Sequence, residues 1–263
     1  MVLRPIDIAA LRKQVESAEP FPHFCIDNFL EPEFAEACAD AFPTFDDAEK
    51  LGRKFEAVNE QKKIQITDSK LFPDPVRKLH ETLASPEWLN TLEQVMGIPK
   101  LVDDPLLNGG GIHMTGPRGH LDVHVDFNYI KDRDLHRRLN ILVYLNREWD
   151  ESWGGAIELW DEKVKVCHHA FAPIFNRCVV FETNNISFHG VSAVVCPEDK
   201  VRQSYAAYYY TKEAPPHWTG EAHSTIFRAR PNEKVKGWFL MPLERATRSL
   251  RRKLGAVKSK MGG

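Results

Sequence analysis

The stretch Gly119-His-Leu-Asp-Val-His-Val-Asp-Phe127 contains a histidine and a carboxylate two residues apart, at the end of an expected β-strand. Side chains at positions i and i+2 of a strand project from the same face, so His124 and Asp126 can reach one point. A second histidine, His189, occurs later in Ile186-Ser-Phe-His-Gly. Two histidines and one carboxylate leave part of a metal's coordination sphere open, which suits non-haem Fe(II), whereas a structural zinc site is closed by four ligands. We therefore predict His124, Asp126 and His189 as ligands of one metal ion.

A His-x-Asp pair by itself is common by chance, so it indicates a metal site only if the surrounding residues support one. The strand expected after His189 begins with Arg202 and carries Ser204 on the same face. A buried guanidinium needs a carboxylate partner, because its fork matches carboxylate geometry and an unpaired buried charge is costly. The alternative for Arg202 is a surface ion pair. We favour burial, because Tyr and Ala dominate the rest of its strand.

The sequence changes character near residue 100, from helical spacing to short strands. Before that point we expect helices over 7–17, 31–41, 74–83 and 86–96, and a short strand within 20–30. After it, segments that alternate or are rich in β-branched and aromatic residues are punctuated by Gly, Asn, Asp and Pro. These predict strands at 111–114, 121–125, 138–145, 156–160, 163–168, 177–181 and 201–210. Such a series is typical of a barrel or a double-sheet jelly roll.

The two-residue period of a strand assigns faces within these segments. In the segment 138–145, Asn140, Leu142 and Tyr144 share one face, and Leu139, Ile141, Val143 and Leu145 share the other. In the segment 201–210, Arg202, Ser204, Ala206 and Tyr208 share a face. We expect the Tyr144 hydroxyl to point inward, with a purely core aromatic as the alternative.

The charge balance of the chain limits its partners. Its 263 residues carry 35 Lys and Arg against 37 Asp and Glu, a net charge of −2. Residues 242–263 hold seven basic residues and one acid, so they carry +6 and the first 241 residues carry −8. We expect no nucleic-acid partner. A basic helix is expected over 244–254; it could contact nucleic acid or an anionic membrane, but we favour a solvated terminal helix.

The cysteines and the apolar runs bear on the compartment. Five widely spaced cysteines without a C-x-x-C pair argue against a disulfide framework or a zinc ribbon. We find no signal-peptide pattern, and no apolar run reaches the ~18 residues that span a bilayer. We therefore expect a reducing, cytoplasmic setting and no transmembrane segment. The sequence predicts no particular oligomeric state.

In order and spacing, several stretches between about residues 110 and 212 resemble Fe(II)- and 2-oxoglutarate-dependent dioxygenases of the prolyl-4-hydroxylase-like family. They are His124-Val-Asp126, the run 138–146 with Trp149, Trp153-Gly-Gly-Ala-Ile-Glu-Leu-Trp160, Phe188-His189-Gly-Val and Arg202-Gln-Ser204-Tyr. The resemblance implies an α+β chain built on a double-stranded β-helix, a jelly-roll or cupin-like core. We expect one domain over 1–263, with mainly helical support in 1–100, the core in 101–212, and a C-terminal extension with the basic helix in 213–263.

The resemblance also implies roles for individual residues. His124, Asp126 and His189 would bind Fe(II), and Arg202 with Ser204 would bind the distal carboxylate of 2-oxoglutarate. Tyr144 matches a tyrosine that also reaches this carboxylate in relatives. One departure is that relatives often carry a co-substrate-binding tyrosine where this chain has His113-Met114. His113 either takes over that contact or the contact is absent.

The implied activity is hydroxylation of an unactivated C–H bond, with 2-oxoglutarate and O₂ as co-substrates, release of succinate and CO₂, and ascorbate as a possible additional cofactor. A prolyl residue, an amino acid or a biosynthetic intermediate could be the substrate, peptidyl or small. Two alternatives are a non-oxidative cupin-type metal enzyme, which would not need Arg202, and a catalytically silent binding module, which would not need all three ligands. The candidate substrate contacts are Asp122, Asn128, Tyr129 and Trp160, with His120, Phe127 and Arg137 near the same mouth. We favour a solvated connector over a substrate clamp for the charged run 131–138.

Overall fold

A single curled sheet forms the body of the molecule in the computed structural model, which describes residues 1–233 and 241. Within these residues the sheet has twelve strands, and five α-helices accompany it. The helices are α1 (Ile8–Glu16), α2 (Pro32–Ala41), α3 (Phe45–Leu51), α4 (Asp74–Leu83) and α5 (Pro86–Met96). The strands are β1 (His23–Ile26), β2 (Arg53–Ala57), β3 (Glu60–Ile66), β4 (Gly111–Val125), β5 (Tyr129–Ile130), β6 (Leu135–Tyr144), β7 (Ile157–Trp160), β8 (Cys167–Phe171), β9 (Cys178–Glu182), β10 (His189–Val191), β11 (Arg202–Thr211) and β12 (Ile226–Phe227).

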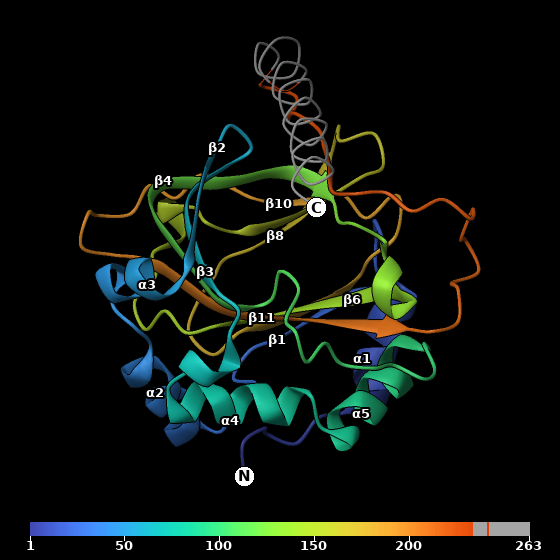
Figure 1. Cartoon of the computed structure of the whole chain (residues 1–263), viewed down its shortest axis with the longest axis horizontal. Helices are drawn as coiled ribbons and strands as arrows, with labels where there is room; N and C mark the ends of the chain where they lie inside the picture. Colours follow the sequence, from blue (N-terminus) through green and yellow to red (C-terminus); the bar gives the residue numbers. More distant parts are fainter. Residues whose placement is uncertain (234–240, 242–263) are drawn as a thin grey trace, which may run out of the picture.

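The sheet is antiparallel and runs in the order β1-β9-β6-β11-β4-β10-β7-β8, with the hairpin β2–β3 and strand β12 added along β4. Figure 1 shows that it folds back on itself, so that β6 and β11 lie on one side and β8 and β10 on the other. The jelly-roll architecture expected from the sequence is confirmed. The space between the two sides is where an internal site can be built.

Strand β4 makes the turn between the two sides. The segments 111–114 and 121–125, expected as separate strands, belong to this one strand. Its first part pairs with β11 and β3, and its last part pairs with β10 and β12. The bend falls at residues 116–119, where Arg118 has a positive φ of 67°. A side chain at Gly119 would approach the Thr115 methyl group to 2.4 Å, so glycine is required at this corner.

The helices cover the outer face of the β6–β11 side and bury the main core against it (Figure 1). The odd-numbered residues of β6 point into this core, as expected: Leu139, Ile141 and Val143 are fully buried. Two tyrosines of β11 tie the layers together through their hydroxyl groups. The Tyr209 hydroxyl accepts a hydrogen bond from Trp88 Nε1 at 2.8 Å, and the Tyr205 hydroxyl lies 2.8 Å from His80 Nδ1.

The helix boundaries follow local capping signals. Helix α5 begins after Ser85, whose Oγ accepts the Trp88 backbone N–H at 3.3 Å, with Pro86 in the first turn. It ends at Gly97, which adopts φ +67°. Helix α1 begins after Asp7, whose carboxylate accepts the Ala10 N–H. All four predicted helices are present within one or two residues.

Three expectations differ from the structure. Residues 45–66, taken as part of a mainly helical region, form α3 and the hairpin β2–β3. The strand expected at 163–168 begins only at Cys167, because the Asp161 carboxylate accepts the N–H groups of Lys165 and Val166 and closes a turn there. The run 131–138 is solvated only in its first half: Lys131–Arg133 form a short 3₁₀ turn, and β6 starts at Leu135 with four buried residues.

Other expectations concern the cysteines, membrane spans and the C-terminal segment. All five cysteines carry free thiols, and Cys178 is fully buried. Within the described part of the chain, no helix is both long and apolar enough to cross a bilayer. The basic helix expected over 244–254, and with it most of the C-terminal extension, lies outside the described residues.

Candidate active site

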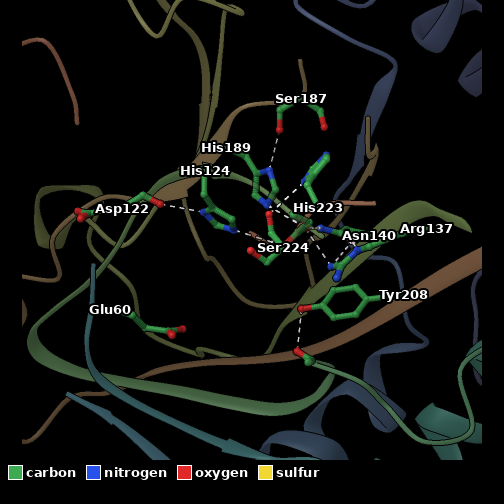
Figure 2. Close-up of polar contacts among 12 residues, drawn as sticks. Glu60, Asp122, His124, Arg137, Asn140, Ser187, His189, Tyr208, His223 and Ser224 are labelled. Atoms are coloured by element: carbon green, nitrogen blue, oxygen red, sulfur yellow. Dashed lines mark hydrogen bonds and ion pairs between the residues drawn. The ribbon is translucent and has the colours of Figure 1, made fainter. Parts of the chain in front are cut away.

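The three predicted metal ligands meet at one point inside the curled sheet. Strands β4 and β10 are antiparallel and place His189 directly opposite His124, while Asp126 follows the last residue of β4. One ligand atom from each residue lies within 4.8 Å of the others. The Asp126 carboxylate is 3.5 Å from His124 Nε2 and 3.4 Å from His189 Nε2. Figure 2 shows the two imidazoles turned toward this common centre.

Both histidines are oriented by their own backbone. His124 Nδ1 lies 2.8 Å from the Asp122 carbonyl, and His189 Nδ1 lies 2.9 Å from the Ser187 carbonyl. A carbonyl oxygen only accepts hydrogen bonds, so each Nδ1 carries the proton and each Nε2 presents a lone pair to the centre. Burial and the neighbouring His124 lower the pKa of His189. Two imidazole nitrogens and one carboxylate form a donor set that fits Fe(II).

The third predicted ligand, Asp126, is held by two side chains of β6. Asn140 Nδ2 donates to Asp126 Oδ2 at 2.8 Å, and Arg137 Nη2 lies 2.9 Å from the same oxygen. Arg137 also donates to Asn140 Oδ1 through Nε and Nη2, which locks the pair together. Burial acts to raise the pKa of Asp126, but Arg137 and the flanking histidines together outweigh it and hold the pKa well below its ordinary value. Asp126 is therefore ionised and ready to bind a cation.

Arg137 reaches this position because β6 contains a bulge. Tyr209 of β11 pairs with Leu139, and Tyr210 pairs with Arg137, so Arg138 is an extra residue. The bulge moves Arg137 from the helix-covered face, where strict alternation would place it, to the interior face. There its guanidinium lies over the Tyr208 ring at 3.6 Å and the Phe127 ring at 4.7 Å. The sequence placed Arg137 only near the mouth and missed its contact with Asp126.

The second half of the site is built around Arg202 at the start of β11. Its side chain is 3% exposed, and within the described residues it forms no ion pair with a carboxylate. Nε donates to the Gly155 carbonyl at 2.7 Å, Nη2 to the Tyr144 hydroxyl at 3.2 Å, and Nη1 to Ser204 Oγ at 3.4 Å. Two further N–H groups of the guanidinium are left for a ligand. A buried cation with this arrangement is suited to an incoming carboxylate.

Tyr144, Ser204 and His113 form one row across strands β6, β11 and β4. Ser204 pairs with Tyr144 on one side and with His113 on the other. Tyr144 is fully buried, and burial raises the pKa of its phenol to about 12, so the hydroxyl keeps its proton. The structure thus brings together the residues that the sequence assigned to the co-substrate, with Tyr144 and Ser204 supporting Arg202 directly.

His113 is turned toward the neighbouring strand. Its Nε2 lies 2.9 Å from the Gln65 side-chain nitrogen and 3.0 Å from the Gly109 carbonyl. Burial, with the charges of Lys63 and Arg202, lowers the pKa of His113 well below its ordinary value. His113 is therefore neutral, and its ring forms a wall of the site.

One cavity of about 450 Å³ joins the metal-ligand group to Arg202. Its deep wall includes His124, Asp126, His189, His113 and Arg202. Its lining also includes residues that the sequence did not single out, from the hairpin β2–β3 and from the segment after β11. They are Arg53, Phe55, Glu60, Lys63, Thr225 and Phe227. The predicted metal ligands and the predicted carboxylate-binding arginine therefore line one space.

The four residues expected to contact substrate are not among those that line this cavity. Asp122 is fully buried beside Arg230 and His120. Asn128 exchanges hydrogen bonds with the backbone of Glu221 and His223. Tyr129 donates to Asp134 at 2.6 Å and packs on His136 and Trp218, and Trp160 packs in a small core with Val123, Val125 and Phe188. Each is held by chain-internal contacts that sequence periodicity does not reveal.

The segment that follows β11, residues 212–233, is called here the strap. Figure 1 shows it in orange, leaving the end of β11 and running around one side of the sheet toward the end of β4. Its strand β12 pairs with Val125 and His124, and the Phe227 ring lies 5.3 Å from the His124 ring. Arg230 fixes its far end, with Nε 2.8 Å from Glu158 Oε2 and Nη2 3.1 Å from the Val191 carbonyl. The strap covers the site beside the predicted ligand His124.

Comparison with known proteins agrees with this geometry. Residues 110–210 match the family model described as the 2OG-Fe(II) oxygenase superfamily. A curated relative, prolyl 3-hydroxylase OGFOD1 of Mus musculus, is 33% identical over 78 residues. These residues are 28% of this chain and 14% of the relative, so the match spans only a small part of the relative's own length.

Solved structures share the fold over most of the chain. A prolyl-4-hydroxylase of Pseudomonas putida is 15% identical with a TM-score of 0.55, covering 78% of this chain and 98% of the other. A prolyl hydroxylase of Trichoplax adhaerens, solved with a hypoxia inducible factor peptide fragment, is 15% identical with a TM-score of 0.57, covering 78% and 89%. The carbocyclase SnoK from nogalamycin biosynthesis is 14% identical with a TM-score of 0.54, covering 80% and 86%. At these identities the likeness shows the fold alone.

Proposed function

We propose that this chain, whose residues 110–210 form a domain of the 2OG-Fe(II) oxygenase superfamily, hydroxylates an unactivated C–H bond and releases succinate and CO₂. The observation that carries the proposal is that the His124–Asp126–His189 group and the unpaired cation of Arg202 open into one cavity. A metal site of three protein ligands leaves positions for a chelating co-substrate and for O₂. A carboxylate-binding arginine in the same cavity fits the far end of 2-oxoglutarate.

The chain itself supplies ligands, orientation and a dry environment. His124, His189 and Asp126 would hold Fe(II), which, when bound, supplies the redox chemistry that activates O₂. The Asp122 and Ser187 carbonyls fix the imidazole tautomers, and Arg137 and Asn140 fix the carboxylate. Phe227 and Phe181 pack beside the histidines and keep bulk water from the ligand atoms.

The co-substrate would be positioned by Arg202. Its guanidinium is held in place by the Gly155 carbonyl, the Tyr144 hydroxyl and Ser204, which leaves its free N–H groups directed to a carboxylate. Because the site is buried, the charge of Arg202 is poorly screened and a carboxylate there is bound strongly. The second end of 2-oxoglutarate would then face the metal ligands across the same cavity.

We place a prolyl residue of a peptide first among possible substrates. The support is the 33% identity to a prolyl 3-hydroxylase and the fold likeness to a prolyl hydroxylase that was solved with a peptide fragment. An amino acid or a biosynthetic intermediate is the alternative, because a carbocyclase shares the fold. Five free thiols support our expectation of a reducing, cytoplasmic setting.

Two other functions are compatible with the sequence pattern. A non-oxidative cupin-type metal enzyme would have no use for Arg202, which is buried without a carboxylate partner among the described residues. A silent binding module would have no use for two histidines whose tautomers are set for metal binding. Both observations favour the oxygenase.

The test is turnover of the co-substrate. Purified protein supplied with Fe(II), 2-oxoglutarate and air should form succinate, and proline-containing peptides should increase the rate. His124→Ala should form none, whereas His80→Ala, which removes a histidine beneath the opposite face of the sheet, should retain activity. Absence of succinate from the folded wild-type protein under these conditions would overturn the proposal.

A further inference from the structure

A second cation, Lys63, lies in the same cross-strand row as Arg202. Thr115 of β4 pairs with Arg202 of β11 on one side and with Lys63 of β3 on the other. Directly paired residues point to the same face of a sheet, and neighbouring strands are about 4.8 Å apart. Lys63 and Arg202 are therefore two strands apart on the interior face, within reach of one ligand placed over Thr115. Both residues, and Thr115 between them, line the cavity.

The pairing of β3 with β4 is irregular beside Lys63, where Lys62 of β3 lies opposite the four residues 116–119 of β4. The register of β3 against β4 shifts between Gln61 and Lys63, and Lys62 has a positive φ of 53°. The shift lets β3 continue past the bend of β4 with Lys63 and Gln65 turned inward, where Gln65 contacts His113. The ammonium group is also 5.3 Å from the centre of the Phe55 ring, on the paired strand β2.

In this structure Lys63 is paired with Glu60, at 2.8 Å between Nζ and Oε1. The side chains are 14% and 16% exposed, so the pair is largely withdrawn from water. Glu60 lines the cavity too, and Figure 2 shows its side chain extending toward the interior of the site. Glu60 therefore acts as an internal counter-ion at the place where an anionic ligand would enter.

The charges of the cavity show why such a counter-ion matters. Asp126 is matched by Arg137 and Glu60 is matched by Lys63, whereas Arg202 makes no ion pair within the described residues. A carboxylate can accept about four hydrogen bonds. Arg202 has two N–H groups left to give, so a carboxylate bound there has capacity for another donor. His113 pairs with Gln65 of β3 and with Ser204 of β11, so it lies one row from Lys63 and Arg202 on the same face.

We infer that Lys63 is a second cation of the co-substrate subsite, and that it exchanges Glu60 for the distal carboxylate of 2-oxoglutarate when the co-substrate binds. This rests on the proposed function, because it assumes that Arg202 marks the distal end of 2-oxoglutarate. The consequence is that Glu60 and the co-substrate compete for the same ammonium group. Loss of the Lys63 charge should therefore weaken co-substrate binding, whereas loss of the Glu60 charge should strengthen it.

The test is anaerobic calorimetric titration of the full chain, loaded with Mn(II), with 2-oxoglutarate. Lys63→Met should raise the Kd about tenfold, the range expected for loss of one charge-assisted hydrogen bond in a partly buried site. Glu60→Gln should lower the Kd about threefold, because Lys63 no longer has to leave a counter-ion. Titration with 2-oxobutyrate, which has the keto acid but no distal carboxylate, should give the same Kd for all three proteins.

The matched control is Lys54→Met, which removes a lysine from the same hairpin that pairs with Glu49 and does not line the cavity. Lys54→Met should leave the Kd for 2-oxoglutarate and the Kd for 2-oxobutyrate unchanged. Lys63→Arg should recover most of the lost affinity and would keep the test valid if the Met variant were poorly folded. An unchanged 2-oxoglutarate Kd in Lys63→Met and Glu60→Gln, with Arg202→Met still weakening it, would overturn this inference alone. Failure of the wild-type protein to bind 2-oxoglutarate would overturn the proposed function as well.

Discussion

His124 and His189 face each other from antiparallel strands, with ring centroids 4.4 Å apart, and each is fixed by a hydrogen bond from Nδ1 to the carbonyl two residues before it. The two imidazoles thus enter the site with the same local geometry and the same tautomer. Their Nε2 atoms and the Asp126 carboxylate are arranged before any ion arrives. A preformed donor set of this kind binds a metal with little loss of conformational entropy in the ligand side chains.

Replacing any one of the three ligands should remove tight metal binding. His124→Ala, Asp126→Ala and His189→Ala each leave two donors, which is too few to hold Fe(II) or a substitute such as Co(II) against the solvent. Equilibrium dialysis with Co(II) would measure this. His120→Ala is the matched control, because His120 lines the cavity without belonging to the ligand group. Equal metal binding by the control and the ligand variants would refute the assignment.

Arg137 should act on the metal through Asp126. Arg137→Met removes the 2.9 Å ion pair to Asp126, the two hydrogen bonds to Asn140 and the stacking of the guanidinium on Tyr208, and it keeps an unbranched apolar side chain at this position. We expect the Co(II) Kd to rise about tenfold, as is usual when an outer partner of a ligand is lost.

Arg147→Met is the control for that experiment, because Arg147 pairs with Glu36 and Asp40 on the surface. Its Co(II) Kd should equal that of the wild-type protein. A wild-type Kd in Arg137→Met would show that the β6 bulge does not serve the metal site.

The buried His113 should make stability depend on pH. The pKa of His113 in the folded chain lies well below 6.5, chiefly because of burial. Just below pH 6.5, His113 therefore binds a proton in the unfolded chain and stays neutral in the folded chain. This contribution to stability is present above pH 6.5 and is lost as the pH falls below that value. Urea unfolding between pH 7.5 and 5 should show the loss. In His113→Gln the slope should be smaller by up to about 1.4 kcal/mol per pH unit. An unchanged slope would mean that His113 is protonated in the folded state.

The strap should depend on Arg230 for its attachment. Arg230→Met breaks the contacts to Glu158 and to the Leu121 and Val191 carbonyls in a site where the side chain is 11% exposed. We expect a loss of about 2 kcal/mol in the free energy of unfolding and faster proteolysis within 212–233. Arg118→Met, which removes an exposed pair with Glu198, should change stability by less than about 1 kcal/mol. Equal stability of the two variants would contradict the strap's role.

Strand periodicity was enough to predict which side chains near Arg202 face the interior of the sheet. Tyr144 and Ser204 fall on interior faces because β6 and β11 keep a regular alternation from 139 to 144 and from 202 to 209. The same rule fails for Arg137, because the extra residue Arg138 reverses the faces before it. A bulge depends on the pairing of two strands, and a single sequence does not show which strands pair.

The cavity wall formed by the hairpin β2–β3 was not predicted, for a related reason. The hairpin β2–β3 lies in a stretch rich in charged residues, where Lys63 and Glu60 look like solvated residues until β4 pairs with them. Asp122 was expected to face the cavity from its position two residues before His124, and Trp160 was expected near the same mouth. In the structure Asp122 lies beside Arg230, and Trp160 packs in a small core. The strands and the meeting of His124, Asp126 and His189 follow from local patterns and their order, whereas the cavity walls follow from long-range packing.

The central claim is that one molecule of 2-oxoglutarate bridges two parts of the site. Its keto-acid end binds the metal held by His124, Asp126 and His189, and its distal carboxylate binds Arg202. Anaerobic titration of the Fe(II)-loaded protein with 2-oxoglutarate, followed by visible absorption, tests this directly. The wild-type protein should develop the charge-transfer absorption of a keto-acid chelate and saturate at one equivalent. Arg202→Met should reach the same final absorption only at much higher 2-oxoglutarate, while it binds Fe(II) normally. No visible absorption in the wild-type protein, or saturation of Arg202→Met at the wild-type concentration, would contradict the account.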